Sequence, residues 1–346
     1  MKFGVFDYIE KGDAPLHQTY DRRMDLLRSL EAAGFYGYHL SEHHATPLSM
    51  TPSPNVFLAA AARETKTIRL GTLLTLLPLY HPMRLLEELC MLDHLSGGRL
   101  DIGVGRGISP FEFDAFGENF EGSGEAFDHC FKVIHQGLLH DRVNYESERY
   151  TFKDAPVLVR PLQTPHPPFW YGLRGGNGPV FAARHGMNGV TLGPDERVAQ
   201  IIQTYREQWA THAAEREAMG SPVASPFVGI MRSVFVADSD AEAERIARAA
   251  HENWFDNLAW LWKERGTMPP IAISGSFDQA RASGALVIGS PQTVTNIFKA
   301  QAQRCGHNYL VLLLAFGTLT HEEQMRSLDL FRTEVMPELA PLNEAA

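Results

Sequence analysis

The sequence has few cysteines, no run of basic residues and no long apolar run near its start. Its three cysteines, Cys90, Cys130 and Cys305, are far apart and odd in number, which argues against a disulfide framework or a zinc knuckle and favours buried free thiols. Lysine and arginine are scattered and the formal net charge is -10, so nucleic acid and anionic membrane surfaces are poor candidate partners. Without a signal peptide or a membrane span, we expect a cytoplasmic protein.

Several catalytic motifs are also missing. The sequence has no Gly-x-Ser-x-Gly and no His-Glu-x-x-His, which argues against a nucleophile elbow and a zinc-protease helix. The glycine-rich segment 103–107 invites a dinucleotide-binding interpretation, but the third glycine of that fingerprint would fall at Ile108. Adjacent imidazoles on an extended segment point to opposite sides, so His43 and His44 are poor joint ligands for one ion and no metal is expected.

The chain instead carries a repeat of short apolar runs and helical patterns. Its 346 residues are 44% hydrophobic, enough for one large α/β barrel or two ordinary domains. Such alternation is typical of βαβ units, and eight units predict an α/β fold, a (β/α)8 TIM barrel. A doubly wound sheet is the competing architecture, but it would need the missing cofactor fingerprint. The predicted strands are residues 3–6, 36–40, 68–74, 100–104, 167–171, 187–192, 227–236 and 309–314.

Two stretches depart from the repeat, after strands four and seven. Residues 118–163 contain a helix at about 127–139 and then a hairpin at about 144–152. Residues 264–284 are rich in Gly, Pro and Ser with weak periodicity, which is typical of a lid or binding loop. Both extend loops of one domain over residues 1–346.

Polar residues stand where predicted strands end. Glu42, His43 and His44 follow the second strand, and His81 follows the third, on the face where barrel active sites form. Two imidazoles and a carboxylate there could move protons, bind a metal or hold an anionic cofactor. A purely structural interpretation, a hydrogen-bonded core histidine beside a surface one, is about as frequent for an isolated pair.

Two arginines follow strands four and five. Arg106, between glycines, could hold a phosphate or carboxylate bidentately, or form a structural salt bridge. The turn Arg174-Gly175-Gly176-Asn177 leads into a predicted helix, so its N–H groups and the Arg174 side chain could converge on an anion. The alternative is a plain turn.

Taken together, these segments resemble the bacterial luciferase-like flavin monooxygenases over nearly the whole chain. The specific parts are Glu42-His43-His44 and residues 92–107. The resemblance implies a (β/α)8 barrel that binds reduced FMN at the carboxyl ends of its strands and uses O2 to form a flavin hydroperoxide. Supporting segments are residues 1–4, 70–72, 81–82, 289–292 and 330–339.

The resemblance also implies roles for individual residues. By resemblance, His43 would lie beside the flavin as proton donor or acceptor, with His44 and Glu42 as further catalytic candidates. Arg106 is similar to the arginine with which the family contacts the phosphate. Leu73 and Leu74 match the positions of a non-proline cis peptide bond beneath the flavin ring. Further cofactor contacts are expected from His81 and from Arg174, Gly175, Gly176 and Asn177, although bacterial luciferase has an acidic residue and a serine in that turn.

Partners follow from the same resemblance. Reduced FMN would come from a separate NAD(P)H:flavin reductase, and the oxygenase would form a homodimer or pair with a paralogue. The substrate would be a small, mostly apolar aldehyde, ketone, alkane-like or sulfur compound, and light emission does not follow. Two rival functions share the fold: a deazaflavin-dependent dehydrogenase or reductase, and a non-catalytic flavin-binding protein.

Overall fold

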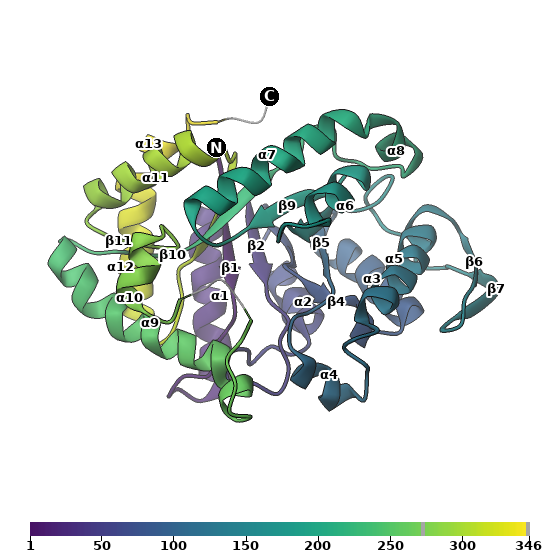
Figure 1. Ribbon diagram of the computed structural model, residues 1–346, viewed down its shortest axis with the longest axis horizontal. Coiled ribbons are helices and arrows are strands. Elements are labelled where there is room, and N and C mark those ends of the chain that lie inside the picture. The colour runs from purple at the N-terminus through teal and green to yellow at the C-terminus, as the bar shows by residue number, and fades with distance from the viewer. Residues whose placement is uncertain (271–273, 344–346) are drawn as a thin grey trace.

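The computed structural model describes residues 1–270 and 274–343 and forms a closed barrel of parallel strands (Figure 1). Eight strands pair in chain order, and β12 pairs with β1 to close the ring. Each overlaps a predicted strand, so the predicted TIM barrel is confirmed. The bounds are β1 Lys2–Asp7, β2 Gly37–Leu40, β3 Arg69–Thr72, β5 Leu100–Gly105, β8 Phe169–Gly172, β9 Asn188–Thr191, β10 Val228–Val236 and β12 Tyr309–Leu313.

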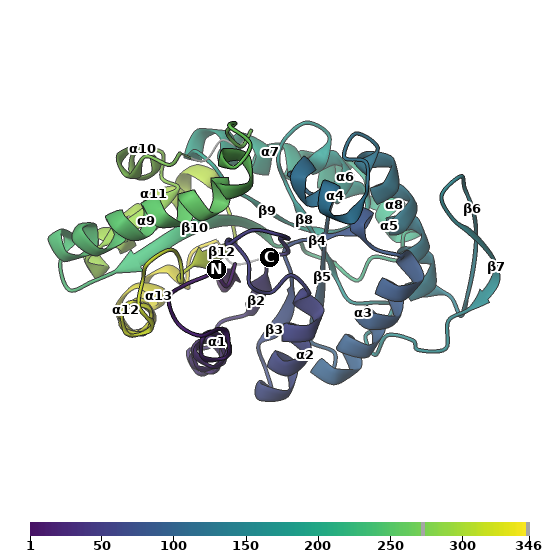
Figure 2. The ribbon, with the colours of Figure 1, turned by 90° about the horizontal axis from the view of Figure 1, so that it is seen from below.

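Helices surround the barrel as an outer layer (Figure 2). Sequential neighbours such as α2 and α3, or α6 and α7, contact each other, and α1 contacts α12. The ring comprises α1 Leu16–Ala32, α2 Pro54–Glu64, α3 Pro82–Ser96, α5 Ser123–Leu139, α6 Gly178–Arg184, α7 Asp195–Thr211, α11 Pro291–Cys305 and α12 His321–Leu330. Short segments extend two of these helices, namely α8 Ala213–Ala218 after α7, and η2 Phe331–Val335 with α13 Met336–Leu339 after α12.

Local sequence signals set several helix ends. Pro82 opens α3, and Gly97 ends it in the left-handed conformation with φ of 67°, which glycine adopts without a steric penalty. The side chain of Ser290 caps the start of α11 by accepting a hydrogen bond from the backbone N–H of Thr293.

The third predicted strand is interrupted near its end. Strand β3 stops at Thr72, and the bond between Leu73 and Leu74 is cis. The chain then resumes pairing with β5 as β4, Thr75–Leu76, followed by the 3-10 turn η1, Leu77–Leu79. The predicted non-proline cis peptide bond is therefore confirmed.

Strand β10 is long enough to leave the barrel. Its first part pairs with β9 and β12, and its last four residues pair with β11, Leu286–Gly289, which the sequence analysis did not predict. Two helices precede β11: α9 Asp240–Lys263 and α10 Phe277–Ala282. The predicted loop 264–284 therefore contains α10, while residues 271–273 within it lie outside the described part of the chain.

The segment after β5 contains more than a loop. Helix α4, Pro110–Phe116, lies at the barrel end, and α5 packs against α3 in the outer ring. The predicted hairpin follows as β6 Arg142–Glu146 and β7 Thr151–Pro156, an antiparallel pair. Of the predicted insertion 118–163, the hairpin is thus the part that projects from the barrel (Figure 1).

The core has two parts. One lies between the strands and the ring helices, and the other fills the barrel and continues onto the apolar face of α9 through Ala247, Trp254 and Leu258. Helix α9 therefore packs on the contents of the barrel. None of the helices in the described ranges combines the length and the hydropathy that a membrane span requires.

Candidate active site

The carboxyl ends of the barrel strands lie at the end of the molecule opposite the N-terminus (Figure 1). Helices α4 and α9 lie at this end, at the bottom of Figure 1, and Figure 2 views the barrel from that side. In parallel α/β barrels this is the face on which loops from different strands converge. The residues that follow β2, β5 and β8 therefore come together here.

Glu42 and His44 form a fixed pair. The carboxyl group of Glu42 is buried, its Oε1 lies 2.8 Å from Nε2 of His44, and its Oε2 accepts a hydrogen bond from the backbone N–H of Leu76 at 3.0 Å. The His44 ring also packs edge-on against Phe116, with 4.6 Å between ring centroids. Together with burial, the Glu42 carboxylate raises the pKa of Tyr80. These contacts link the loop after β2 to β4.

His43 points to the other side of the loop and binds a different carboxylate. Its Nδ1 lies 2.8 Å from Oε1 of Glu112, a residue of α4 that is 1% exposed. An ionised carboxylate only accepts hydrogen bonds, so Nδ1 donates, and Nε2 of the neutral ring is left as the proton acceptor. Nε2 has no hydrogen bond to any described residue. The His43 side chain is 18% exposed, and the centroid of its ring lies 5.7 Å from the ring centroid of Tyr8.

Glu112 is the site residue that the sequence analysis missed. It stands third in α4, after Ser109 and Pro110, and this pattern predicts a helix start in which the glutamate caps the backbone. Instead, its Oε1 accepts from His43 and from the backbone N–H of His44 at 3.2 Å. The Ser-Pro-x-Glu pattern of residues 109–112 could have predicted where this helix begins. It could not have predicted that the carboxylate of Glu112 binds His43.

The cis bond between Leu73 and Leu74 fits against glycines of β5. A Cβ on Gly103 would lie 1.9 Å from the carbonyl oxygen of Thr72, and one on Gly105 would lie 2.6 Å from Cδ1 of Leu74. Any larger residue would therefore displace this segment. Leu73 belongs to the cluster that fills the barrel, and Leu74 packs against that cluster.

Arg106 and Arg174 lie at the ends of the paired strands β5 and β8. Neither forms an ion pair with a carboxylate within residues 1–270 and 274–343. The Arg106 guanidinium lies 5.6 Å from the centroid of Phe120. Arg174 is an exposed residue, but the protein atoms around its guanidinium group displace water and thereby lower its pKa; the positive charges of Arg106 and Arg197 lower it further, and Tyr8 and Tyr171 oppose the effect. Two guanidinium groups without carboxylate partners among the described residues give this side of the mouth a positive charge.

The turn after β8 also has the predicted course. Gly175 and Gly176 have φ of 91° and 58°, a left-handed course that favours glycine, and Asn177 precedes α6. The carbonyl oxygen of Arg174 accepts a hydrogen bond from Nη2 of Arg197 at 3.0 Å. This contact fixes the backbone from which the Arg174 side chain extends.

The structure does not bring His81 together with the other candidates. It precedes α3, is exposed, and its ring packs edge-on against Tyr150 and Phe152 near the hairpin. None of the candidate residues is among its described contacts. The position of His81 after strand three predicted the correct end of the barrel, but its side chain packs against the hairpin instead of turning toward the site.

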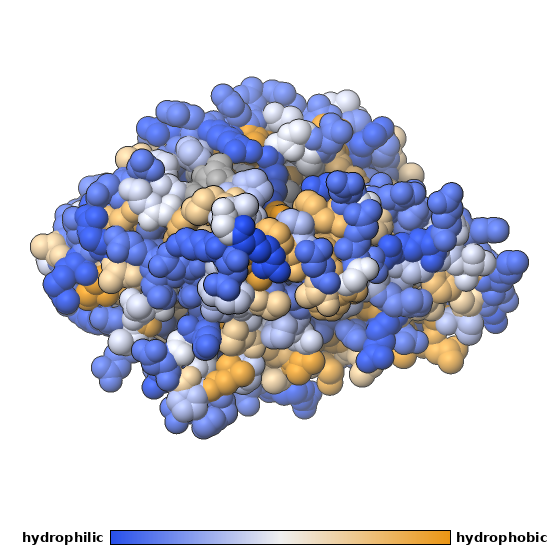
Figure 3. All heavy atoms as spheres, turned by 60° about the horizontal axis from the view of Figure 1, so that its bottom comes forward, coloured by the Kyte–Doolittle hydropathy of each residue, from blue (hydrophilic) through white to orange (hydrophobic). Residues whose placement is uncertain are grey.

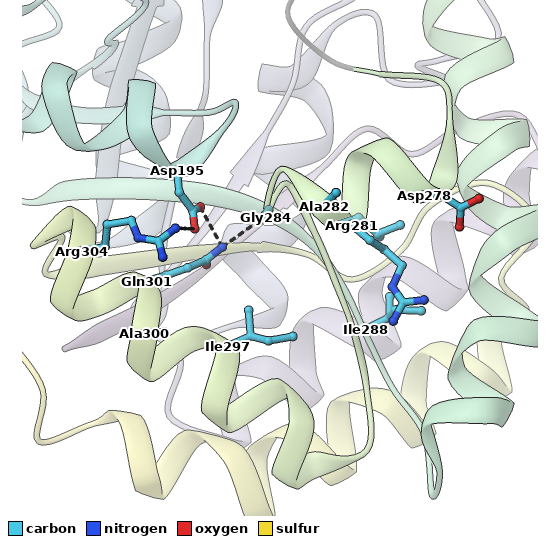
Figure 4. Close-up of a pocket in the computed structure, with 11 residues that line it drawn as sticks. Asp195, Asp278, Arg281, Ala282, Gly284, Ile288, Ile297, Ala300, Gln301 and Arg304 are labelled. Atoms are coloured by element: carbon cyan, nitrogen blue, oxygen red, sulfur yellow. Dashed lines mark hydrogen bonds and ion pairs between the residues drawn. The ribbon is translucent and has the colours of Figure 1, made fainter.

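A separate groove of about 480 Å³ lies between α10, β11 and α11 (Figure 4). Arg304, Gln301 and Asp195 lie at one end of it, and Arg281 and Asp278 lie at the other. Asp195 is 2.9 Å from the buried guanidinium of Arg232 and thereby ties α7 to β10. The groove shares no residue with the candidate site.

Comparison with known proteins identifies the family of the chain. The family model for luciferase-like monooxygenases matches residues 1–307. The oxygenase component of the flavin-dependent trigonelline monooxygenase of Acinetobacter baylyi is 29% identical, over 97% of this chain and 95% of its own length.

Solved structures extend the comparison to the fold. Monooxygenase RslO1 of Streptomyces bottropensis has a TM-score of 0.86 at 26% identity, covering 98% of this chain and 100% of its own. The coenzyme F420-dependent tetrahydromethanopterin reductase of Methanopyrus kandleri shares the fold, with a TM-score of 0.71 at 21% identity over 97% and 98% of the two chains. The sequence, the barrel and the family match lead to one conclusion: the chain belongs to the luciferase-like monooxygenases, a family of oxidoreductases.

Proposed function

We propose that this protein is the oxygenase component of a two-component flavin monooxygenase. In this proposal, residues 1–346 act as one barrel domain that uses reduced FMN and O2 to oxygenate a small, mostly apolar substrate. The observation that carries the proposal is the arrangement at the barrel mouth, where His43 packs against Tyr8 with Nε2 free, and Tyr8 is in turn an electrostatic neighbour of Arg174, which has no carboxylate partner in the described chain. A proton-transfer group and an anion site thus face the same mouth.

The side chains at the mouth suit FMN. The guanidinium groups of Arg106 and Arg174 match the charge of its phosphate, and the glycine turn after Arg174 leaves room for close approach. Leu73 and Leu74 offer an apolar surface for the flavin ring. Reduced FMN, when bound, supplies the two electrons with which one atom of O2 enters the substrate while the other leaves as water.

His43 is the proposed proton carrier of the reaction. Because Glu112 holds Nδ1, Nε2 is the atom that accepts or delivers a proton at the mouth. Glu42 and His44 act on this site indirectly, by fixing the loop that carries His43. Tyr8 packs against His43, and Phe6 and Trp254 pack against Tyr8. These aromatic rings favour a mostly apolar substrate such as an aldehyde, a ketone, an alkane-like chain or a sulfur compound.

A separate NAD(P)H:flavin reductase is the proposed partner. The sequence lacks a convincing dinucleotide fingerprint, so the chain has no evident means of reducing its own flavin. The trigonelline relative is likewise described as an oxygenase component, which supports a division of labour between two proteins.

The reaction class can be tested with reduced FMN and air. Rapid mixing of the protein with chemically reduced FMN and oxygenated buffer should produce a transient absorbance that differs from both oxidised and reduced flavin. Reduced FMN without protein is the control. Oxidation of bound FMN at the rate of free flavin would favour a non-catalytic flavin-binding protein. Tight binding of a deazaflavin with no reaction toward O2 would favour the dehydrogenase alternative.

We also propose that two copies associate through α2 and α3. Val56 is 73% exposed, Met91 54% and Leu95 39%, and the nearby segment exposes Leu158 and Leu162 by 89% and 49%. Figure 3 shows hydrophobic side chains along the lower edge of its view, the side on which α2 lies in Figure 2. A cluster of exposed apolar side chains often marks a site of interaction with another protein, whereas single exposed apolar residues are common on any surface.

Changing Met91 to glutamate should convert the dimer to a monomer, because a charge would be buried without a partner in the interface. Light scattering after size-exclusion chromatography measures the mass directly. Met268→Glu is the matched control, since Met268 is 59% exposed outside α2, α3 and the neighbouring segment. A wild-type protein that is monomeric at micromolar concentration would contradict the proposal.

A further inference from the structure

Tyr8 is a buried tyrosine at the barrel mouth whose hydroxyl group has no part in the chemistry proposed so far. It directly follows β1 and is 5% exposed. The ring centroids of Phe6 and Trp254 lie 4.7 Å and 6.4 Å from that of Tyr8. The His43 ring lies 5.7 Å away, with an angle of 37° between the two ring planes. Rings from β1, from α9 and from the loop after β2 thus hold the tyrosine ring in one position.

The hydroxyl group of this ring is free. It has no hydrogen bond to any residue within 1–270 and 274–343. The polar atoms that this part of the chain encloses without a partner include the indole nitrogen of Trp254 and the hydroxyl groups of Ser41 and Thr191. The hydroxyl group of Tyr8 is not among them, so it borders open space at the mouth, as Nε2 of His43 does.

The Tyr8 hydroxyl group is a hydrogen-bond donor at neutral pH. Burial raises the pKa of Tyr8 above its ordinary value, the charge of Glu10 adds to this effect, and the charge of Arg174 opposes it only in part. The phenol therefore stays protonated, whereas the free Nε2 of the neutral His43 ring accepts. Adjacent rings thus offer the mouth one uncharged donor and one uncharged acceptor.

The strand order separates Tyr8 from the surface proposed for the flavin ring. Strand β2 lies between β1 and β3. Because these strands end on one face, the loop that carries His43 stands between Tyr8, after β1, and the Leu73–Leu74 segment, after β3. With the flavin ring on the two leucines, the space beside Tyr8 and His43 is left for the substrate.

We propose that Tyr8 determines the substrate class by donating a hydrogen bond from its hydroxyl group to a carbonyl oxygen of the substrate. The enzyme then oxygenates aldehydes or ketones in preference to alkane-like chains and thioethers. This inference rests on the proposed function. A carbonyl oxygen replaces the bond that the phenol makes to water, whereas a hydrocarbon chain or a weakly accepting sulfur atom displaces the water and leaves the phenol unpaired. Sites built to hydrogen-bond a substrate reject analogues that lack the bonding group.

The same hydrogen bond assists the oxygenation of a carbonyl group. One atom of O2 forms a bond to the carbonyl carbon, and the carbonyl oxygen gains electron density that the Tyr8 hydroxyl group stabilises. That atom then enters the bond between the carbonyl carbon and its substituent, so an aldehyde becomes a carboxylic acid and a ketone becomes an ester. The other atom leaves as water, with two electrons and two protons from reduced FMN, which ends as oxidised FMN.

The dye para-dimethylaminobenzaldehyde tests the contact without turnover, because its absorbance moves to longer wavelength when its carbonyl oxygen accepts a hydrogen bond. It should absorb at a longer wavelength when bound to the wild-type protein than when bound to Tyr8→Phe, both with and without oxidised FMN. Tyr8→Phe should also bind it about 2-fold to 12-fold more weakly, the effect of one hydrogen bond between uncharged groups. The analogue para-dimethylaminostyrene lacks the carbonyl oxygen and should bind equally to both proteins.

Tyr145→Phe is the matched control variant. The Tyr145 hydroxyl group, on β6 of the projecting hairpin, lies 2.6 Å from Nδ1 of His129, so its loss should leave the bound dye unchanged. Tyr8→Phe removes no described hydrogen bond, and its thermal unfolding should therefore match that of the wild-type protein.

The same absorbance maximum for the aldehyde bound to Tyr8→Phe and to the wild-type protein would overturn the proposal. A wild-type protein that binds the aldehyde no more tightly than the styrene would overturn it as well. So would a change in FMN absorbance or affinity in Tyr8→Phe with aldehyde binding unaltered, since the hydroxyl group would then face the flavin. Neither O2 nor reduced flavin enters these measurements, so their outcome is separate from the test of the reaction class with reduced FMN and air.

Discussion

Replacing His43 by alanine should reduce product formation by about 100-fold to 10,000-fold, the usual contribution of a positioned acid or base. The structure leaves Nε2 of His43 free at the mouth while Glu112 holds Nδ1, so no described side chain can replace it at that position. FMN binding should change little, because the proposed phosphate contacts come from Arg106 and Arg174. Single-turnover product yield and an FMN titration on the same preparation separate the two effects.

Glu112→Gln provides a graded companion to that variant. Glutamine can still accept the Nδ1 hydrogen bond but has no charge to stabilise a protonated His43, so the rate should fall by less than in His43→Ala. His43→Ala with wild-type turnover would rule out the assigned role. Loss of the folded state, monitored by circular dichroism, would instead identify a structural role for the contact between His43 and Glu112.

Replacing Arg106 or Arg174 by alanine should weaken FMN binding by about 10-fold to 150-fold each. A charge-assisted contact to phosphate contributes about 1.5 to 3 kcal/mol, and neither guanidinium has a carboxylate partner in the described chain that would compete for it. Fluorescence titration with FMN at fixed ionic strength measures this loss, and raised salt should reduce the difference between wild type and variant.

Riboflavin, which lacks the phosphate, is the matched probe for these variants. Its affinity should be nearly the same in Arg106→Ala and the wild-type protein. Arg142→Ala, on the projecting hairpin, is the control variant and should bind FMN normally. An equal loss of riboflavin and FMN affinity in Arg106→Ala would mean that the arginine supports the ring or the fold and does not bind the phosphate.

Much of the barrel was predictable because its signals are local. Short apolar runs, such as residues 309–314, alternate along the chain with segments of helical periodicity. Pro82 and Gly97 mark the two ends of α3. Positions after strand ends predicted the location of His43 and Arg106 for the same reason, since parallel strands in a barrel end on one face. Strand β11 was missed because four apolar residues carry too little periodicity to distinguish a strand from a loop.

The sequence by itself determined the eightfold repeat, the strand ends and the residue types at the mouth, because helix and strand periodicity, prolines and glycines act over a few neighbouring residues. Only the tertiary structure decided which partners those residues have. It joined His43 to Glu112, 69 positions away, and Glu10 to Asn257, 247 positions away, and it turned His81 toward the hairpin. Such contacts depend on packing between distant elements, which local sequence patterns do not encode.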